Sequence, residues 1–232
     1  NRRGNHKWVN VGPSYGGGQT RVQNISQHYP ENEQLLRDVL KSTPMSRLAG
    51  WIDATFKTIA PAMHERYRQV LCTVLENDEK VTPNFTHNVF AAATFNLGPK
   101  VSTIVHTDHL NYAPGWCAIV PLGDFNHRTG GQLVLWDLNL VIDFPAGSLI
   151  FIPSAILRHS NTPVGRSETR MSFTQFTAGG IFRWADCGCK SLKQLEEEGG
   201  SLHLDGAARW KADLEKYPTW EELIAQGLAA RR

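Results

Sequence analysis

The sequence predicts an α+β fold in which a double-stranded β-helix, or jelly roll, has flanking N- and C-terminal helices. Apolar residues recur at helical spacing between 31 and 77. Short apolar segments separated by Gly- and Pro-containing turns follow from 88 to 178, and helical spacing returns after Gly179-Gly180. Many short strands with such turns are typical of a sandwich or jelly roll. A chain of 232 residues is long enough for one substantial domain with a real core.

The first third of the chain is expected to support this core. Residues 1–27 are polar and Gly-rich, and they lack the lysine and Ser/Thr of a phosphate-binding loop, so we expect a loop segment over the domain surface. Helical support is predicted over 31–77, with helices at about 31–42, 45–59 and 61–77. Pro61 lies in the first turn of the third helix, where proline is well tolerated. Their apolar spacing indicates packing against a sheet.

The jelly-roll core is expected over 88–180 and a set of helices over 181–232. The predicted strands are 88–96, 101–106, 115–121, 131–136, 139–143, 148–152 and 170–178. The predicted C-terminal helices are about 190–198, 205–216 and 218–230. The whole chain, 1–232, is therefore interpreted as a single domain.

Composition excludes some classes of protein. The formal net charge is only +2, so there is no global basic signature of nucleic-acid binding. Four scattered cysteines form no disulfide framework, which fits a reducing compartment, and Cys187 and Cys189 are interpreted as free thiols in a turn rather than a metal or redox pair. Neither a signal peptide nor an apolar run of membrane-spanning length occurs. Because the chain begins at Asn1 rather than Met, we expect a piece of a longer protein.

Two histidines and one carboxylate fall where predicted strands end. His106 and Asp108 follow the apolar run 101–105, and His159 follows the strand 148–152. Chance alone gives roughly 0.4 His-x-Asp triplets in such a chain, so the position matters more than the triplet. Two histidines and one carboxylate are the ligands of mononuclear non-haem iron(II), and they leave three octahedral positions open. The sequence thus predicts an iron site at His106, Asp108 and His159.

An arginine on the last predicted strand completes the pattern. A 2-oxo acid chelates through two open positions and dioxygen takes the third, while Arg170 is suited to pair with the far carboxylate of 2-oxoglutarate. Period-two alternation puts Ser172, Thr174 and Phe176 on the face of Arg170, and Ser172 offers a hydroxyl donor. Arg166 is the competing anchor, but it follows a glycine in a turn. The predicted activity is that of an iron- and 2-oxoglutarate-dependent dioxygenase.

Five stretches of the sequence resemble the TET/JBP oxygenases, and in particular the compact homologues of mushroom-forming fungi. They are FNLGP at 95–99, HTD at 106–108, GWCAI at 115–119, GGQLVLW at 130–136 and IPSAILRHSNT at 152–162. The HTD…H…R set is common to the whole superfamily, whereas the GWCA and IPSAILRH strings are more specific. The likeness extends from about residue 16 to residue 184.

The resemblance implies a nuclear enzyme that oxidises the methyl group of 5-methylcytosine in double-stranded DNA to hydroxymethyl, formyl and carboxyl forms. We expect it to be a monomer. It implies iron(II), 2-oxoglutarate and O2, with His106, Asp108 and His159 as metal ligands. It matches Arg170 to the 2-oxoglutarate arginine and Phe176 to a base-stacking position. We also expect Ser172 and Asn96 to take part with Arg170 in co-substrate binding. Asn96 and Asn111 fall near the groups that read the base edge. The chain lacks the cysteine-rich zinc module of the vertebrate enzymes, which leaves N6-methyladenine as a second candidate base.

Independently of the resemblance, a buried iron reaches a methylated base only if the base is flipped out, onto a stacking surface. Phe176, Tyr112 and Trp116 are candidate stackers. Candidate phosphate contacts are Arg2, Arg3, Lys7, Lys100, His127, Arg128, Arg209 and Lys211. Two alternatives remain open: a 2-oxoglutarate dioxygenase that acts on a protein side chain or small molecule, and an inactive jelly-roll module that binds DNA.

Overall fold

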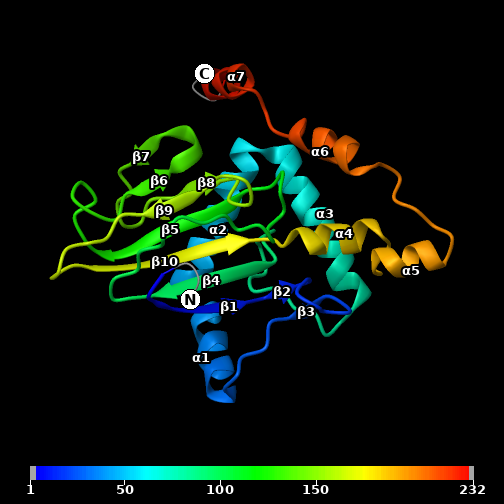
Figure 1. The fold of residues 1–232 in the computed structure, drawn as a ribbon, viewed down its shortest axis with the longest axis horizontal. Helices are drawn as coiled ribbons and strands as arrows, with labels where there is room; N and C mark the ends of the chain where they lie inside the picture. Colours follow the sequence, from blue (N-terminus) through cyan, green and yellow to red (C-terminus); the bar gives the residue numbers. More distant parts are fainter. Residues whose placement is uncertain (1–3, 230–232) are drawn as a thin grey trace.

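Two larger antiparallel sheets, a separate two-stranded antiparallel ribbon and a covering layer of helices make up the computed structural model, which describes residues 4–229 (Figure 1). The elements are β1 (Lys7–Val11), β2 (Pro13–Ser14), β3 (Gln23–Asn24), α1 (Pro30–Lys41), α2 (Thr43–Ile59), α3 (Pro61–Asn77), β4 (Ala92–Leu97), β5 (Cys117–Asp124), β6 (Leu133–Leu135), η1 (Trp136–Leu138), β7 (Leu140–Ile142), β8 (Ile150–Ile152), β9 (His159–Asn161), β10 (Thr169–Phe176), α4 (Gly179–Asp186), α5 (Leu192–Glu197), α6 (Gly206–Leu214) and α7 (Trp220–Ala229). No helix among residues 4–229 combines the length and apolar content needed to cross a membrane.

The predicted jelly roll is confirmed. The larger sheet has the strand order β1-β4-β10-β5-β8 and the smaller one the order β7-β6-β9, and neighbouring strands within each run antiparallel. Leu133 and Leu135 of β6 pack with Ile152 of β8 and Ile119 of β5, so the two sheets face each other across an apolar layer. The cavity described below lies between them.

Strand β10 separates the cavity from the helical layer by simple alternation. Phe173 is buried in the main core with residues of α2 and α3, while Ser172 and Thr174 point to the opposite face, toward the cavity. Figure 1 shows α2 behind the larger sheet and α3 beside it. The three N-terminal helices begin at or within two residues of their predicted starts, because each carries a proline in its first turn.

Phe56 of α2 is fully buried at the centre of this helical layer. Its ring packs against those of Tyr67, Phe90, Trp116 and Phe151. We expect Phe56→Ala to lower the free energy of unfolding by about 3–5 kcal/mol, because the cavity left behind cannot collapse between so many rings. Trp51, which is 44% exposed on the same helix, is the matched control, and Trp51→Ala should stay within about 0.5 kcal/mol of wild type. Urea titration measures both, and equal effects would contradict the assigned core.

Four predicted segments need correction. The predicted N-terminal loop, 1–27, contains β1, which pairs with β4 as the edge of the larger sheet, so its Val-rich stretch acts as a strand. The predicted strand 101–106 is no strand, because its backbone bonds go first to β10, through Val101, and then to β9, through His106. The strand predicted from 88 begins only at Ala92.

The fourth correction concerns the C-terminal helices. Helix α4 begins at the glycine pair itself, about ten residues before the first predicted C-terminal helix. A Cβ at Gly180 would lie 2.5 Å from the carbonyl oxygen of Tyr15, so this glycine permits a close approach of the N-terminal segment. The other three helices occur within a few residues of their predicted bounds.

Candidate metal centre and co-substrate pocket

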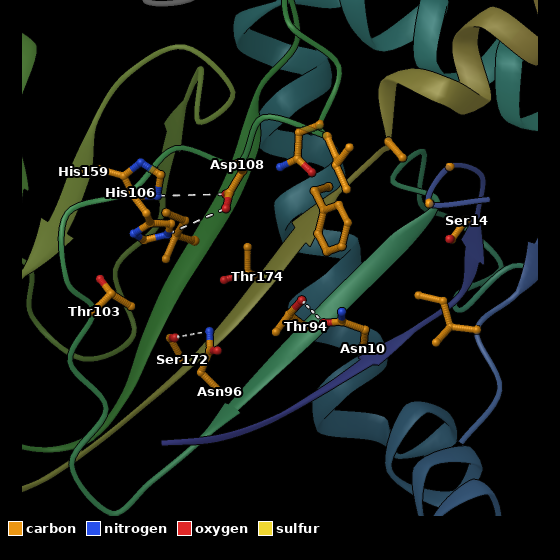
Figure 2. Close-up of a pocket in the computed structure, with 18 of the residues that line it drawn as sticks. Asn10, Ser14, Thr94, Asn96, Thr103, His106, Asp108, His159, Ser172 and Thr174 are labelled. Carbon is orange, nitrogen blue, oxygen red and sulfur yellow. Dashed lines mark hydrogen bonds and ion pairs between the residues drawn. The ribbon is translucent and has the colours of Figure 1, made fainter. Parts of the chain in front are cut away.

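His106 and His159 lie opposite each other because their backbones pair. The amide of His106 donates to the carbonyl of His159 at 3.1 Å, and the amide of His159 donates back to His106 at 2.9 Å. This antiparallel bridge joins residues that are some fifty positions apart and puts the ring centroids 4.3 Å from each other. Two imidazoles therefore face one point between the sheets (Figure 2).

Asp108 supplies the carboxylate. Its amide donates to the carbonyl of Ser154 at 2.8 Å, which fixes the turn after His106 against the loop that follows β8. One carboxylate oxygen lies 3.7 Å from Nε2 of His106 and the other lies 4.0 Å from Nε2 of His159. One potential ligand atom from each of the three residues lies within 4.8 Å of the others, and among residues 4–229 this is the only such group of three or more.

Backbone hydrogen bonds select the imidazole tautomer suited to a metal. Nδ1 of His106 lies 2.8 Å from the carbonyl of Ile104, and Nδ1 of His159 lies 2.9 Å from the carbonyl of Leu157. Because a carbonyl only accepts, each Nδ1 donates its proton and each Nε2 keeps its lone pair for a ligand. The three residues fit a metal with a 2-His-1-carboxylate face and three open positions.

Arg170 is a buried guanidinium with unused donors. Its side chain is 0% exposed, Nη1 donates to the carbonyl of Val101 at 3.1 Å, and the guanidinium lies 5.8 Å from the ring centroid of Phe125. Nε and Nη2 are buried and make no hydrogen bond with the described residues. Burial lowers the pKa of Arg170 to about 10. A buried cation with free donors is incomplete without an anion. Arg166 instead lies exposed in a turn, which favours Arg170 as the carboxylate anchor.

The cavity beside the metal ligands has a volume of about 270 Å³. Its lining includes the three ligands together with Ser172, Phe176, Asn96 and Asn111, all of which the sequence predicted. Nδ2 of Asn96 donates to Oγ of Ser172 at 3.0 Å, so β4 and β10 present a linked polar pair (Figure 2). Nδ2 of Asn111 donates to Oγ of Ser154, which leaves its carbonyl oxygen available to a ligand.

Two candidate base-stacking residues lie elsewhere. Tyr112 does not line the cavity: its ring stacks on Phe182 at 3.5 Å and its hydroxyl donates to Asp213. Trp116 stacks on Tyr217 at 4.4 Å and packs against the main core. Both follow the turn after Asp108, where the chain leaves the cavity for the helical layer. Phe176 alone of the three faces the cavity.

Sequence reasoning missed part of the cavity wall. Asn10, Ser14 and Tyr15 come from the N-terminal segment, and Oγ1 of Thr94 on β4 donates to Oδ1 of Asn10 at 2.6 Å (Figure 2). The only sequence signal for this part of the wall is the pair of β-branched residues that flank Asn10, Val9 and Val11, which predicts a short strand between Gly4 and Gly12. The candidate phosphate residues Arg2 and Arg3 lie outside the described residues.

The cysteine pair plays no part in this site. Cys187 is buried and Cys189 half-buried, both as free thiols, and neither belongs to a three-ligand cluster among residues 4–229. Sγ of Cys189 lies 3.7 Å from the carbonyl of Thr73 on α3. Cys187 lies in the turn that follows α4, and Cys189 comes two residues later.

Comparison with solved structures finds the fold of NgTET1 in complex with 5mC DNA, with a TM-score of 0.57 and 16% identity over 75% of this chain. The alignment covers 61% of NgTET1, so the chain spans about three fifths of that protein's length. A 2OG-Fe(II) oxygenase family oxidoreductase from Burkholderia pseudomallei aligns at TM-score 0.41, with 18% identity over 77% of this chain and 71% of its own. An RmlC-like cupin protein from Desulfovibrio desulfuricans aligns at 0.24, with 19% identity over 37% and 68%. Scores that low do not establish a shared fold.

No protein-family model matches the chain, and no curated protein matches its sequence. The resemblance predicted from the sequence is thus confirmed at the level of the fold.

Proposed function

We propose that this protein is an iron(II)- and 2-oxoglutarate-dependent dioxygenase that oxidises the methyl group of 5-methylcytosine in DNA. The observation that carries the proposal is a 2-His-1-carboxylate group in the same fold as a buried arginine whose Nε and Nη2 make no hydrogen bond with the described residues. Arg170 does not itself line the cavity, but it lies on β10 two residues before Ser172, which does. A metal alone would not need that arginine. A dicarboxylate that chelates the metal through one end needs the metal centre for that end and Arg170 for its far carboxylate.

The residues have distinct tasks. His106, Asp108 and His159 would hold iron(II), which would supply the activation of O2 that is coupled to decarboxylation of 2-oxoglutarate to succinate. Arg170 binds the C5 carboxylate of the co-substrate through the two donors left free by Val101. Ser172, oriented by Asn96, offers a hydroxyl on the same strand face. Burial of Arg170 excludes water from this ion pair and strengthens it.

DNA is the proposed substrate because the cavity has the parts that a flipped base requires. Phe176 offers an aromatic face, and Asn111 and Asn10 add amide groups for the base edge. NgTET1, which shares the fold, was solved with 5mC DNA. N6-methyladenine in DNA is proposed as a second substrate. We further propose that the enzyme acts in the nucleus as a monomer on double-stranded DNA.

The test is mass spectrometry of nucleosides from duplex DNA that carries both modified bases. The DNA is incubated with the protein, iron(II), 2-oxoglutarate and ascorbate, with Asp108→Ala as control. We expect loss of 5-methylcytosine and appearance of its oxidised forms with wild type only. Succinate release without any change in the DNA would instead support the alternative of a protein or small-molecule substrate. Absence of both reactions would favour the inactive binding module.

Phe176→Ala tests the stacking role. Base–aromatic stacking contributes about 1–3 kcal/mol per base, so kcat/KM for methylated duplex should fall roughly 5- to 100-fold. Phe176→Tyr keeps the ring and should retain most of the activity. The 2-oxoglutarate concentration at half-maximal rate should not change in either variant, since Arg170 is intact. A Phe176→Ala enzyme that turns over DNA at the wild-type rate would remove this residue from the base site.

A further inference from the structure

A second cavity adjoins the iron-site cavity. It has a volume of about 520 Å³ and shares with the first a wall formed by Tyr15, Gly16, Leu110 and Asn111. On its other side it shares Asp186, Arg209 and Asp213 with a third cavity of about 340 Å³. We call the second cavity the arginine groove, after Arg183 of α4 and Arg209 of α6, which line it. Each cavity therefore shares wall residues with the next, so the three follow one another away from the metal ligands, an arrangement suited to an elongated ligand.

The acidic residues of the arginine groove are already paired. Nη2 of Arg66 donates to both carboxylate oxygens of Asp186, at 2.7 and 2.8 Å. Asp213 forms an ion pair with Lys216, with 3.0 Å between Oδ1 and Nζ, and accepts a hydrogen bond from the hydroxyl of Tyr112. Both negative charges are therefore compensated from within the fold.

The two arginines of the arginine groove, in contrast, are not paired. Neither the Arg183 nor the Arg209 side chain has an ion pair or hydrogen bond with any residue in the described part of the chain. Arg183 is exposed and Arg209 half-buried, so both guanidinium groups are accessible to a ligand. With the two aspartates compensated, the groove carries a local excess of two positive charges in a chain whose formal net charge is only +2.

An aromatic ring lies beside these charges. Trp210, next to Arg209 on α6, is 36% exposed and lines the same groove. Two unpaired guanidinium groups and an exposed indole are the combination that binds a nucleotide strand, since arginines bind phosphates and aromatic faces stack on bases. A small carboxylate would not use the indole, and an apolar ligand would not use the arginines.

We propose that the arginine groove binds the DNA strand that flanks the flipped nucleotide, with Arg183 and Arg209 on consecutive phosphates and Trp210 stacked on an adjacent base. This rests on the proposed function, because the flipped base must lie in the neighbouring cavity. The shared wall at Leu110 and Asn111 puts the two binding regions within reach of one strand. The groove would thus hold the substrate in register with the metal.

The test is binding of a fluorescein-labelled duplex with one 5-methylcytosine, measured by anisotropy without oxygen and with iron(II) and 2-oxoglutarate present. Titrations run between about 50 and 200 mM KCl, where counterion release governs affinity. For Arg183→Gln/Arg209→Gln we expect about tenfold weaker binding or more. The slope of log affinity against log salt should become shallower by about 1.4 to 1.8, the value for two lost phosphate contacts.

Arg47→Gln/Lys57→Gln is the matched control. It removes the same charge from exposed positions on α2, and neither residue lines any of the three cavities. Its salt slope should equal that of wild type. Trp210→Ala should weaken binding about 5- to 100-fold without changing the slope, because stacking releases no counterions. Trp210→Phe should recover most of the affinity.

The outcomes separate this inference from the proposed function. If wild type binds and oxidises the duplex but Arg183→Gln/Arg209→Gln keeps the wild-type slope, the groove assignment is wrong and the activity stands. If wild type neither binds nor oxidises DNA, both are wrong. Oxidation of the free nucleoside 5-methyl-2′-deoxycytidine, which has no flanking phosphate, should be equal in wild type and the double variant. Thermal melting checks that each variant is folded.

Discussion

Asp108→Ala and His106→Ala are each expected to abolish oxidation and to leave the fold intact. Loss of a residue that merely orients a metal ligand costs about 10- to 100-fold in affinity or activity, so loss of a ligand should exceed 100-fold. The jelly roll does not depend on either side chain, because their positions are held by backbone bonds to His159 and Ser154. Bound iron per chain and succinate release measure the effect, and far-UV circular dichroism measures the fold.

His87→Ala is the matched control for His106→Ala. His87 is exposed and does not line the iron-site cavity, so its loss should change neither iron content nor turnover. If Asp108→Ala or His106→Ala retained turnover, the metal assignment would be wrong. If iron bound normally but turnover disappeared, the residue would act in a later step than metal binding.

Arg170→Ala is expected to raise the Kd for 2-oxoglutarate by about 100- to 4,000-fold. Removal of one partner of a buried ion pair costs about 3–5 kcal/mol, because the other charge stays buried without compensation. Arg170→Lys keeps a charge but not the two parallel donors, so it should recover only part of the affinity. Calorimetric titration of 2-oxoglutarate into the iron-free protein, with Mn(II) in the metal site, measures the change.

Replacement of Arg170 should weaken co-substrate binding but increase the stability of the protein without 2-oxoglutarate. The pKa of Arg170 is lowered because burial desolvates the charged guanidinium. At every pH below about 10 this charge therefore lowers the stability of the folded protein. The loss of stability disappears only as the pH rises toward the higher pKa that the arginine has in the unfolded chain. Arg170→Met has similar length and no charge. We expect its free energy of unfolding without 2-oxoglutarate to rise by about 1 kcal/mol or more, and its stabilisation by 2-oxoglutarate to vanish.

Arg166→Ala provides the contrast, since Arg166 is exposed one turn before β10. We expect the Arg166→Ala variant to bind 2-oxoglutarate with the same affinity as wild type. A large loss of affinity in Arg166→Ala, with normal affinity in Arg170→Ala, would move the anchor to the turn.

The elements that sequence predicted well are those with a strong local signal. The prolines at Pro30, Pro44 and Pro61 begin helices, and the alternation along 170–176 gives the cavity face of β10. The sequence also named His106, Asp108 and His159 as one group, and the structure brings these three side chains together. The expected reason was wrong, because 101–106 is no strand and His106 is instead positioned by its backbone bridge to His159.

What the sequence did not predict depends on partners distant in the chain. The segment 101–106 looks like a strand because it is apolar, yet its backbone donors and acceptors are divided between two sheets. Tyr112 and Trp116 lie near the metal ligands in sequence, but the chain turns them into the helical layer, where Phe182 and Tyr217 hold them. The contribution of Asn10 to the cavity needs the pairing of β1 with β4, over eighty residues away. No local pattern encodes such long-range pairing.

The backbone bridge between His106 and His159 has a further consequence for the chain as a polymer. A metal held by both imidazoles closes a loop of some fifty residues, and that loop contains β5, β6, β7 and β8. Like a disulfide, such a cross-link restricts the unfolded chain, but it forms and dissolves with the concentration of free metal. The chain's resistance to unfolding would therefore depend on iron supply, so that metal starvation would remove this cross-link as well as turnover.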